Sequence, residues 1–152
     1  MDSLYFVPIE FMSPEYDSCV RLRDKLLRRP LQLEFTETQL EAEINEFHFG
    51  VFDLENNLLG CLSFKPVNTT TLKMRQVAVE EEQQGKGIGT FIVMESEKWA
   101  RANNYKHIEL HARDTAVSFY SKLKYQKAGN MFVEVNIPHW AMRKSLIKNK
   151  KQ

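Results

Sequence analysis

The sequence has few of the features that mark secreted, membrane or nucleic-acid-binding proteins. It contains two cysteines, Cys19 and Cys61, which lie far apart among apolar neighbours. They indicate buried thiols in a reducing compartment rather than a disulfide framework. No apolar run is long enough to span a bilayer, and the N-terminal segment lacks the basic region and cleavage site of a secretory signal. The formal net charge is +1, so no broad field favours nucleic acid or a membrane surface. We therefore expect a cytoplasmic protein with neither partner.

The cysteines and histidines also lack the spacing of a metal site, so we expect no metal. Internal repeats and low-complexity stretches are missing. With 152 residues, of which 43% are hydrophobic and 27% charged, the composition is that of an ordinary globular protein. We expect one domain over residues 1–147 and a frayed basic tail over 148–152.

The stretch from Met74 to Trp99 contains the clearest local pattern. Its first residues, up to Val79, form an apolar run typical of a strand that is covered on both faces. Five polar residues follow, and then Gly85, Gly87 and Gly89 occupy every second position. The pattern predicts a buried strand, a glycine-rich loop and a helix that begins where the glycines end.

The predicted helix carries Ile88, Ile92 and Trp99 at helical spacing, with charged residues between them. A helix start leaves backbone N–H groups unpaired and carries partial positive charge, so it favours an anion such as phosphate. Glycines let a ligand approach that backbone closely. The stretch therefore predicts a phosphate-binding loop, and the alternative is a tight strand-to-helix turn without a ligand.

The spacing of the glycines restricts the kind of phosphate site. A dinucleotide fingerprint needs a third glycine where Ile92 stands, and a P-loop needs a glycine five residues before Gly85. The pattern that fits is Q-x-x-G-x-G, from Gln84 to Gly89, directly after a strand that ends in Val-Ala-Val.

The rest of the chain reads as a mixed α/β sequence. The predicted order is β-α-α-β-β-β-α-β-α-β-β. The strands are expected at residues 4–9, 47–53, 58–67, 74–79, 107–111, 131–135 and 140–146. Two helices are expected at residues 13–27 and 88–102. A third helix is expected to begin at the Thr36–Gln39 capping box, and a fourth at Asp114 or Thr115. Arg28 to Pro30 is expected to be a loop, and residues 136–138 are expected to join the last two strands. A right-handed crossover at the centre predicts a mixed α/β (α+β) sheet of about seven strands with helices on both faces.

The Q-x-x-G-x-G pattern after Val-Ala-Val resembles motif A of the GNAT N-acetyltransferase superfamily. The resemblance implies that the loop binds the pyrophosphate of acetyl-CoA as co-substrate. It also implies that backbone groups of the strand end align the pantetheine arm and that one N–H polarises the thioester carbonyl. The loop residues are Gln84, Gly85, Lys86, Gly87, Ile88, Gly89 and Thr90, and the strand residues are Val77, Ala78 and Val79.

A second stretch, from Leu110 to Tyr125, resembles the A-x-x-F/L-Y-x-K-x-G-F pattern of the same family. Ala116, Phe119 and Tyr120 match it, and so do Lys122 and Tyr125. The resemblance implies that the helix lies against the pantetheine arm, near Arg113, and that Tyr120 points at the sulfur. A phenol with a pKa of about 10 is protonated at neutral pH and can donate its proton to the departing thiolate. The alternative is an amphipathic-helix tyrosine with a buried ring.

Two residues depart from the family pattern. Lys124 stands where a glycine is expected after the helix, and Arg113 stands where an asparagine is common. Lys124 must therefore take a C-terminal turn that glycine tolerates better.

The sequence offers three candidates for the general base that an ammonium acceptor requires. They are His111 at a strand end, His139 after Ile137-Pro138, and Glu34 between the first two helices. A histidine at a strand end is also a common structural residue. The ending from Phe132 to Met142 resembles that of ElaA-like GNAT proteins, and the early segment from Leu22 resembles a small uncharacterised branch.

We therefore expect an acetyl-CoA-dependent N-acetyltransferase that transfers acetyl to a primary amine by direct attack in a ternary complex. The amine is a small molecule or a peptide, and a homodimer through the C-terminal strands is possible by family analogy. One alternative is a non-catalytic acyl-CoA-binding or interaction module on the same fold. Another is a nucleotide-phosphate binder outside the family. Arg28 and Arg29 belong either to a solvated loop or to a site for an acidic acceptor.

Overall fold

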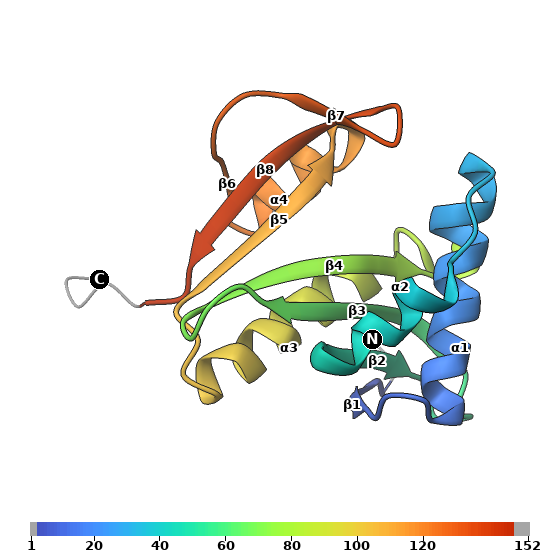
Figure 1. The fold of residues 1–152 in the computed structure, drawn as a ribbon. Coiled ribbons are helices and arrows are strands. Elements are labelled where there is room, and N and C mark those ends of the chain that lie inside the picture. The colour runs from blue at the N-terminus through green and yellow to red at the C-terminus, as the bar shows by residue number, and fades with distance from the viewer. Residues whose placement is uncertain (1–2, 148–152) are drawn as a thin grey trace.

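A computed structural model describes residues 3–147, which form one twisted sheet with helices on both faces (Figure 1). The sheet has eight strands in the order β1-β2-β3-β4-β5-β8-β6, and β7 also pairs with β8. The strands are β1 (Tyr5–Ile9), β2 (Phe47–Phe52), β3 (Leu58–Pro66), β4 (Thr71–Val79), β5 (His107–Arg113), β6 (Gln126–Lys127), β7 (Phe132–Glu134) and β8 (Ile137–Ser145). All pairs are antiparallel except β4–β5, which is parallel. The predicted mixed fold is therefore confirmed.

Helices cover the two faces of this sheet. The α-helices are α1 (Pro14–Arg23), α2 (Glu37–Glu41), α3 (Ile88–Ala102) and α4 (Val117–Lys122). The larger core lies between the sheet and α3, with α4 beside it, and a second core lies between the other face and α1 (Figure 1). Cys19 and Cys61 are free, buried thiols of that second core. No helix within residues 3–147 is long and apolar enough to cross a membrane.

Several predicted elements occur as expected. The hairpin of β2 and β3 and the Thr36–Gln39 capping box are both present, with Gln39 N donating to Thr36 Oγ1 and Thr36 N to Gln39 Oε1. The basic tail at 148–152 lies outside the described residues.

Three boundaries were predicted wrongly. Arg28–Pro30 is helical rather than a loop, because a π-helical turn (Asp24–Arg28) and a 3₁₀ turn (Arg29–Leu31) continue α1, with Pro30 in a position that needs no N–H donor. Ile137 and Pro138 belong to β8, since the hairpin turn is made by Val135 and Asn136 at φ values of 45° and 62°.

The third boundary concerns α4, which begins at Val117 without a side-chain cap. The carboxylate of Asp114, which could have capped it, instead accepts a hydrogen bond from Trp140 Nε1 at 3.1 Å. A 3₁₀ turn over Asp114–Ala116 leads into the helix. The predicted cap at Asp114 or Thr115 is therefore wrong, because a tertiary contact takes the side chain.

The centre of the sheet is split. β4 and β5 pair from Thr71 and His107 only as far as Met74 and Leu110, and then diverge (Figure 1). Just beyond that point β4 contains a β-bulge, where Gln76 adopts a φ of 57° and the register with β3 shifts. The β5-facing backbone groups of the second half of β4 therefore have no β5 strand partner.

The segment between α1 and β2 is fixed by a buried ion pair. Arg23 and Glu43, each 2% exposed, form two hydrogen bonds of 2.9 and 2.6 Å, and Tyr16 Oη donates to the same carboxylate at 2.8 Å. Burial alone would raise the pKa of Glu43, but the hydrogen bonds and charge of Arg23 outweigh it and keep that pKa below its ordinary value. His48 Nε2 also lies 2.8 Å from the Glu43 carbonyl oxygen. The network attaches α1 to the start of β2.

Replacing Glu43 with alanine should leave the guanidinium of Arg23 buried without its partner. We expect a loss of about 3–5 kcal/mol in the free energy of unfolding, which thermal denaturation would register as a large fall in Tm. Glu41→Ala, on the exposed side of α2, is the control and should change stability by at most about 0.5 kcal/mol. Equal losses in both variants would contradict a structural role for the pair.

Candidate functional site

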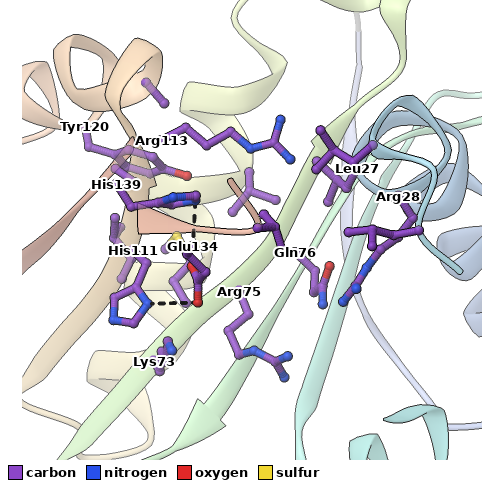
Figure 2. A pocket seen from close by; sticks show the side chains of 18 residues that line it. Leu27, Arg28, Lys73, Arg75, Gln76, His111, Arg113, Tyr120, Glu134 and His139 are labelled. Carbon is purple, nitrogen blue, oxygen red and sulfur yellow. Dashed lines mark ion pairs between the residues drawn. The ribbon is translucent and has the colours of Figure 1, made fainter. Parts of the chain in front are cut away.

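A cavity of about 340 Å³ opens where β4 and β5 diverge (Figure 2). One wall is the helical segment after α1, the other is the β7–β8 turn, and β4, β5 and α4 supply the remainder. Its polar lining residues are Arg28, Lys73, Arg75, Gln76, His111, Arg113, Tyr120, Glu134 and His139, and its apolar ones are Leu27, Leu31, Leu33, Met74, Val77, Leu110, Ala112, Ala116 and Val135.

Tyr120 lines this cavity from α4 and is 8% exposed. Its ring packs edge-on against Phe119 and Tyr125, with centroid distances of 5.0 and 5.8 Å. Burial raises the pKa of Tyr120 to about 12. The phenol is therefore protonated at neutral pH and can act as a proton donor to a group in the cavity.

His111 and His139 meet at a carboxylate that sequence analysis missed. Glu134 Oε1 lies 3.7 Å from His111 Nδ1, and Glu134 Oε2 lies 3.7 Å from His139 Nε2 (Figure 2). His139 Nδ1 also lies 2.7 Å from the Ile137 carbonyl oxygen, which can only accept, so Nδ1 carries a proton. The three side chains form a cluster, hereafter the His–Glu cluster, that faces the cavity.

The two histidines differ in their surroundings. Burial is the main cause that lowers the pKa of His111, and the neighbouring charge of Lys73 lowers it further, while Glu134 opposes both. His111 is therefore neutral at pH 7 and can accept a proton. His139 is more deeply buried, at 5% exposure.

Of the other site residues predicted from the sequence, some line the cavity and others do not. Arg113, Ala116 and Val77 line the cavity. Glu34 does not line it. Ala78 packs instead into the second core with α1.

The glycine-rich loop lies outside the cavity, at the start of α3. Gly85 and Gly87 have φ values of 79° and 85°, which glycine tolerates without strain, and Gly87 is the N-cap of α3. α3 starts at Ile88, so its first backbone N–H groups, from Ile88 to Thr90, have no acceptor within the helix. This arrangement suits an anion.

Other motif residues have structural contacts of their own. Gln84 Nε2 donates to the Val79 carbonyl oxygen at 3.0 Å and so ties the loop to the end of β4. A Cβ on Gly89 would lie 3.3 Å from the Phe119 ring, so this glycine permits the close approach of α4. Phe119 therefore supports the loop from below rather than lining the cavity. Lys86 is exposed beside the loop.

Lys124 adopts the conformation that its position requires. Its φ is 76°, and Tyr125 N donates to the Tyr120 carbonyl oxygen at 3.1 Å, as in a Schellman turn. The departure from glycine therefore leaves the end of α4 intact and adds local backbone strain.

The comparisons agree with this geometry. The model of the acetyltransferase (GNAT) family matches residues 13–125. The chain belongs to the GNAT acetyltransferase family. It is 30% identical over 126 residues to the uncharacterised protein YyaT of Bacillus subtilis strain 168, covering 76% of this chain and 84% of that protein.

Solved structures share the fold at low sequence identity. A Lactobacillus plantarum protein described as a proposed N-acetyltransferase is 17% identical with a TM-score of 0.83, covering 96% of this chain and 100% of that one. An aminoglycoside 6'-N-acetyltransferase complexed with coenzyme A is 16% identical with a TM-score of 0.78, covering 95% and 98%. A family member from Elizabethkingia anophelis with acetyl-CoA bound is 15% identical with a TM-score of 0.73, covering 95% and 99%.

Coenzyme A binding can be tested through thermal stability. A ligand at 100 times its Kd adds about 2.7 kcal/mol to the free energy of unfolding. We expect coenzyme A and acetyl-CoA to raise Tm by several degrees, because the loop suits phosphate, and we expect ATP and NAD to leave Tm unchanged.

A pair of matched glycine variants locates the binding. Gly85→Ala and Gly129→Ala both introduce a methyl group at positive φ, and at neither position does the methyl contact a protein atom within 4 Å. Both should lower Tm alike, but Gly85→Ala alone should reduce the shift caused by coenzyme A. An equal shift in the two variants would place the phosphates elsewhere.

Proposed function

We propose that this protein is an acetyl-CoA-dependent N-acetyltransferase that transfers the acetyl group directly to a primary amine in a ternary complex. The observation that carries the proposal is the position of Tyr120. Its buried, protonated side chain lines the cavity where the two central strands separate, on the same side as the His–Glu cluster (Figure 2). A proton donor and a proton acceptor thus face the same space.

In this proposal the loop from Gln84 to Thr90 binds the pyrophosphate of acetyl-CoA. The pantetheine arm then follows β4 into the split and pairs with backbone groups from Val77 to Val79 that have no β5 partner. A β4 N–H that polarises the thioester carbonyl would stabilise the oxyanion of the tetrahedral intermediate. Arg113 and Ala116 hold the far side of the arm, and Phe119 packs against Gly89 of the loop.

The reaction forms a C–N bond and breaks a C–S bond. The neutral amine attacks the thioester carbonyl, and the intermediate collapses with expulsion of the coenzyme A thiolate. Tyr120 gives its proton to that sulfur and regains one that the nitrogen releases. The net change is from an ammonium and a thioester to an amide, a thiol and one proton.

The His–Glu cluster would take the proton from the acceptor ammonium. His111 is the member whose lowered pKa keeps it neutral at pH 7, and Glu134 lies between both imidazoles. The carboxylate also offers the incoming ammonium a counter-charge before it loses the proton.

Tyr120→Phe tests the acid directly. We expect kcat to fall by roughly 10²–10⁴, because the thiolate would leave without a proton donor, while the Tm shift with coenzyme A stays unchanged. Tyr105→Phe removes a hydroxyl just after the C-terminal end of α3, from a residue that does not line the cavity, and should keep full activity. Thiol release during turnover is the readout.

If Tyr120→Phe retains the activity of the unmodified protein, the assignment of Tyr120 as acid is wrong. If coenzyme A binds but no amine causes thiol release, the chain is an acyl-CoA-binding module instead.

The pH dependence tests the base. Because the pKa of His111 lies below its ordinary value of 6.5, its neutral form persists at pH 7, and kcat/KM should fall only below about pH 6.5, where the imidazole is protonated. His111→Gln should lower kcat/KM and flatten this acid limb, whereas the control variant Lys106→Gln, at an exposed residue just before β5, should keep it. An unchanged limb in His111→Gln would exclude His111 as the base.

A further inference from the structure

The cavity carries a surplus of positive charge. Arg28, Lys73, Arg75 and Arg113 line it, and Glu134 is the one carboxylate among the lining residues. Arg75 is partly neutralised, because its Nη1 lies 2.7 Å from Glu46 Oε2. Within residues 3–147, by contrast, Arg28, Lys73 and Arg113 form no ion pair. The cavity thus combines several free cationic groups with one acidic cluster.

Arg28 is held in place although it has no acidic partner. Its guanidinium lies 4.5 Å from the centroid of the Phe35 ring, and the π-helical turn fixes its backbone. Burial, and then the like charges of Arg23 and Arg75, lower the pKa of Arg28. A stacked guanidinium keeps its N–H edge available, and an anion would relieve the repulsion between these cations.

Lys73 belongs to the same positive region. Burial is the main cause that lowers its pKa, the nearby charge of Glu134 opposes this, and the charge of Arg75 lowers it further. Lys73 and Arg75 alternate along β4 with the buried Met74, so their side chains lie on the same face of the sheet, and both line the cavity. Lys73 thus lies beside the His–Glu cluster, whereas Arg28 reaches the cavity from the helical segment across from it (Figure 2).

The phosphates of coenzyme A do not account for this charge. The loop that suits pyrophosphate follows Val79, whereas Arg75 lies four positions earlier on β4, at about 13 Å along a strand. Lys73 is farther still. Lys73 and Arg75 therefore lie away from the loop that suits the pyrophosphate, and Arg28 lies on a different wall of the cavity.

We propose that the acceptor is an amine that also carries an anionic group, a carboxylate or a phosphate, as in an amino acid or a phosphorylated amine. Its ammonium binds at the His–Glu cluster near Tyr120, and its anion binds Arg28 on the opposite wall of the cavity (Figure 2). Polyamines and aminoglycosides, which carry only positive charge, would be repelled from this wall. The inference rests on the proposed acetyl transfer and specifies its substrate.

The test measures thiol release from acetyl-CoA with pairs of amines that differ only in the anion. Each of a panel of L-amino acids is compared with its own amide, and phosphoethanolamine with ethanolamine. Spermidine and kanamycin represent purely cationic amines. We expect kcat/KM to fall at least tenfold when the anion is removed, as for the loss of a charge-assisted hydrogen bond. Comparing the rates with amino acids and with phosphoethanolamine decides whether a carboxylate or a phosphate is recognised.

Arg28→Gln then tests the residue, with Arg29→Gln as the matched control. Arg29 is the next residue, but its side chain is 69% exposed and pairs with Asp24 at 3.0 Å. Arg28→Gln should raise KM for the anionic amine by roughly tenfold or more and remove the preference for the acid over its amide. Arg28→Lys should restore part of that preference, and the Tm shift with coenzyme A should be equal in all variants.

The possible results separate the inference from the proposed function. Thiol release with spermidine or kanamycin at a kcat/KM equal to or above that of every anionic amine would overturn the inference and leave the acetyltransferase intact. Equal kcat/KM for the amino acid and its amide in the unmodified protein would also overturn the inference and leave the acetyltransferase intact. If no amine causes thiol release although coenzyme A binds, the proposed function fails, and the inference fails with it.

Discussion

The hydrogen-bonded pairing of β4 and β5 stops after Met74 and Leu110, and the whole site depends on this break. Buried backbone N–H and C=O groups are rarely left without partners, so an open parallel edge inside a domain needs something to occupy it. The bulge at Gln76 turns the second half of β4 and directs Val77 into the cavity. An extended chain with its own amides, such as pantetheine, can supply the missing partners in the way a strand would.

Two separate structural features hold the walls of this cavity in place. On one side the buried pair of Arg23 and Glu43 fixes the helical segment that carries Arg28. On the other side a tight turn through Val135 and Asn136 sets the register of β7 on β8 and thereby presents Glu134. Each feature has an energetic cost. The ion pair buries two charges, and the turn holds the β-branched Val135 at positive φ. Their combined effect is to hold charged groups at defined positions around an otherwise open cavity.

The features that could be predicted from the sequence are those that depend on short stretches of the chain. The glycine loop, the capping box and the β2–β3 hairpin each depend on residues within a few positions of one another. Local sequence patterns are therefore enough to predict them. The pattern around Tyr120 was also recognisable, and the structure places that residue at the cavity. What makes Tyr120 a strong candidate, its burial and its raised pKa, is a property of the packing between α4 and the sheet.

The sequence could not reveal Glu134, because its role arises from strand register. His111 and His139 lie 28 positions apart, and they meet because β8 runs antiparallel to β5 with Arg113 opposite His139. The β7 strand then brings Glu134 between them. Likewise the helical continuation of α1 through Arg28 was missed, since Pro30 and the two arginines before it suggested a loop. Tertiary contacts, including the stacking of Arg28 on Phe35, decide that segment.

The positive charge of the cavity also bears on the chemistry. A primary ammonium has a pKa of about 10.4 in water, far above that of any histidine, so a weak base alone would deprotonate it rarely. Nearby cations disfavour the charged form of such a group and lower its pKa. The field of Arg28, Lys73 and Arg113 would therefore ease loss of the acceptor's proton to a neutral His111, and it would also stabilise the oxyanion and the thiolate that form next. The charges that we propose to select an anionic amine would thus also allow a modest base and a phenol to complete the transfer.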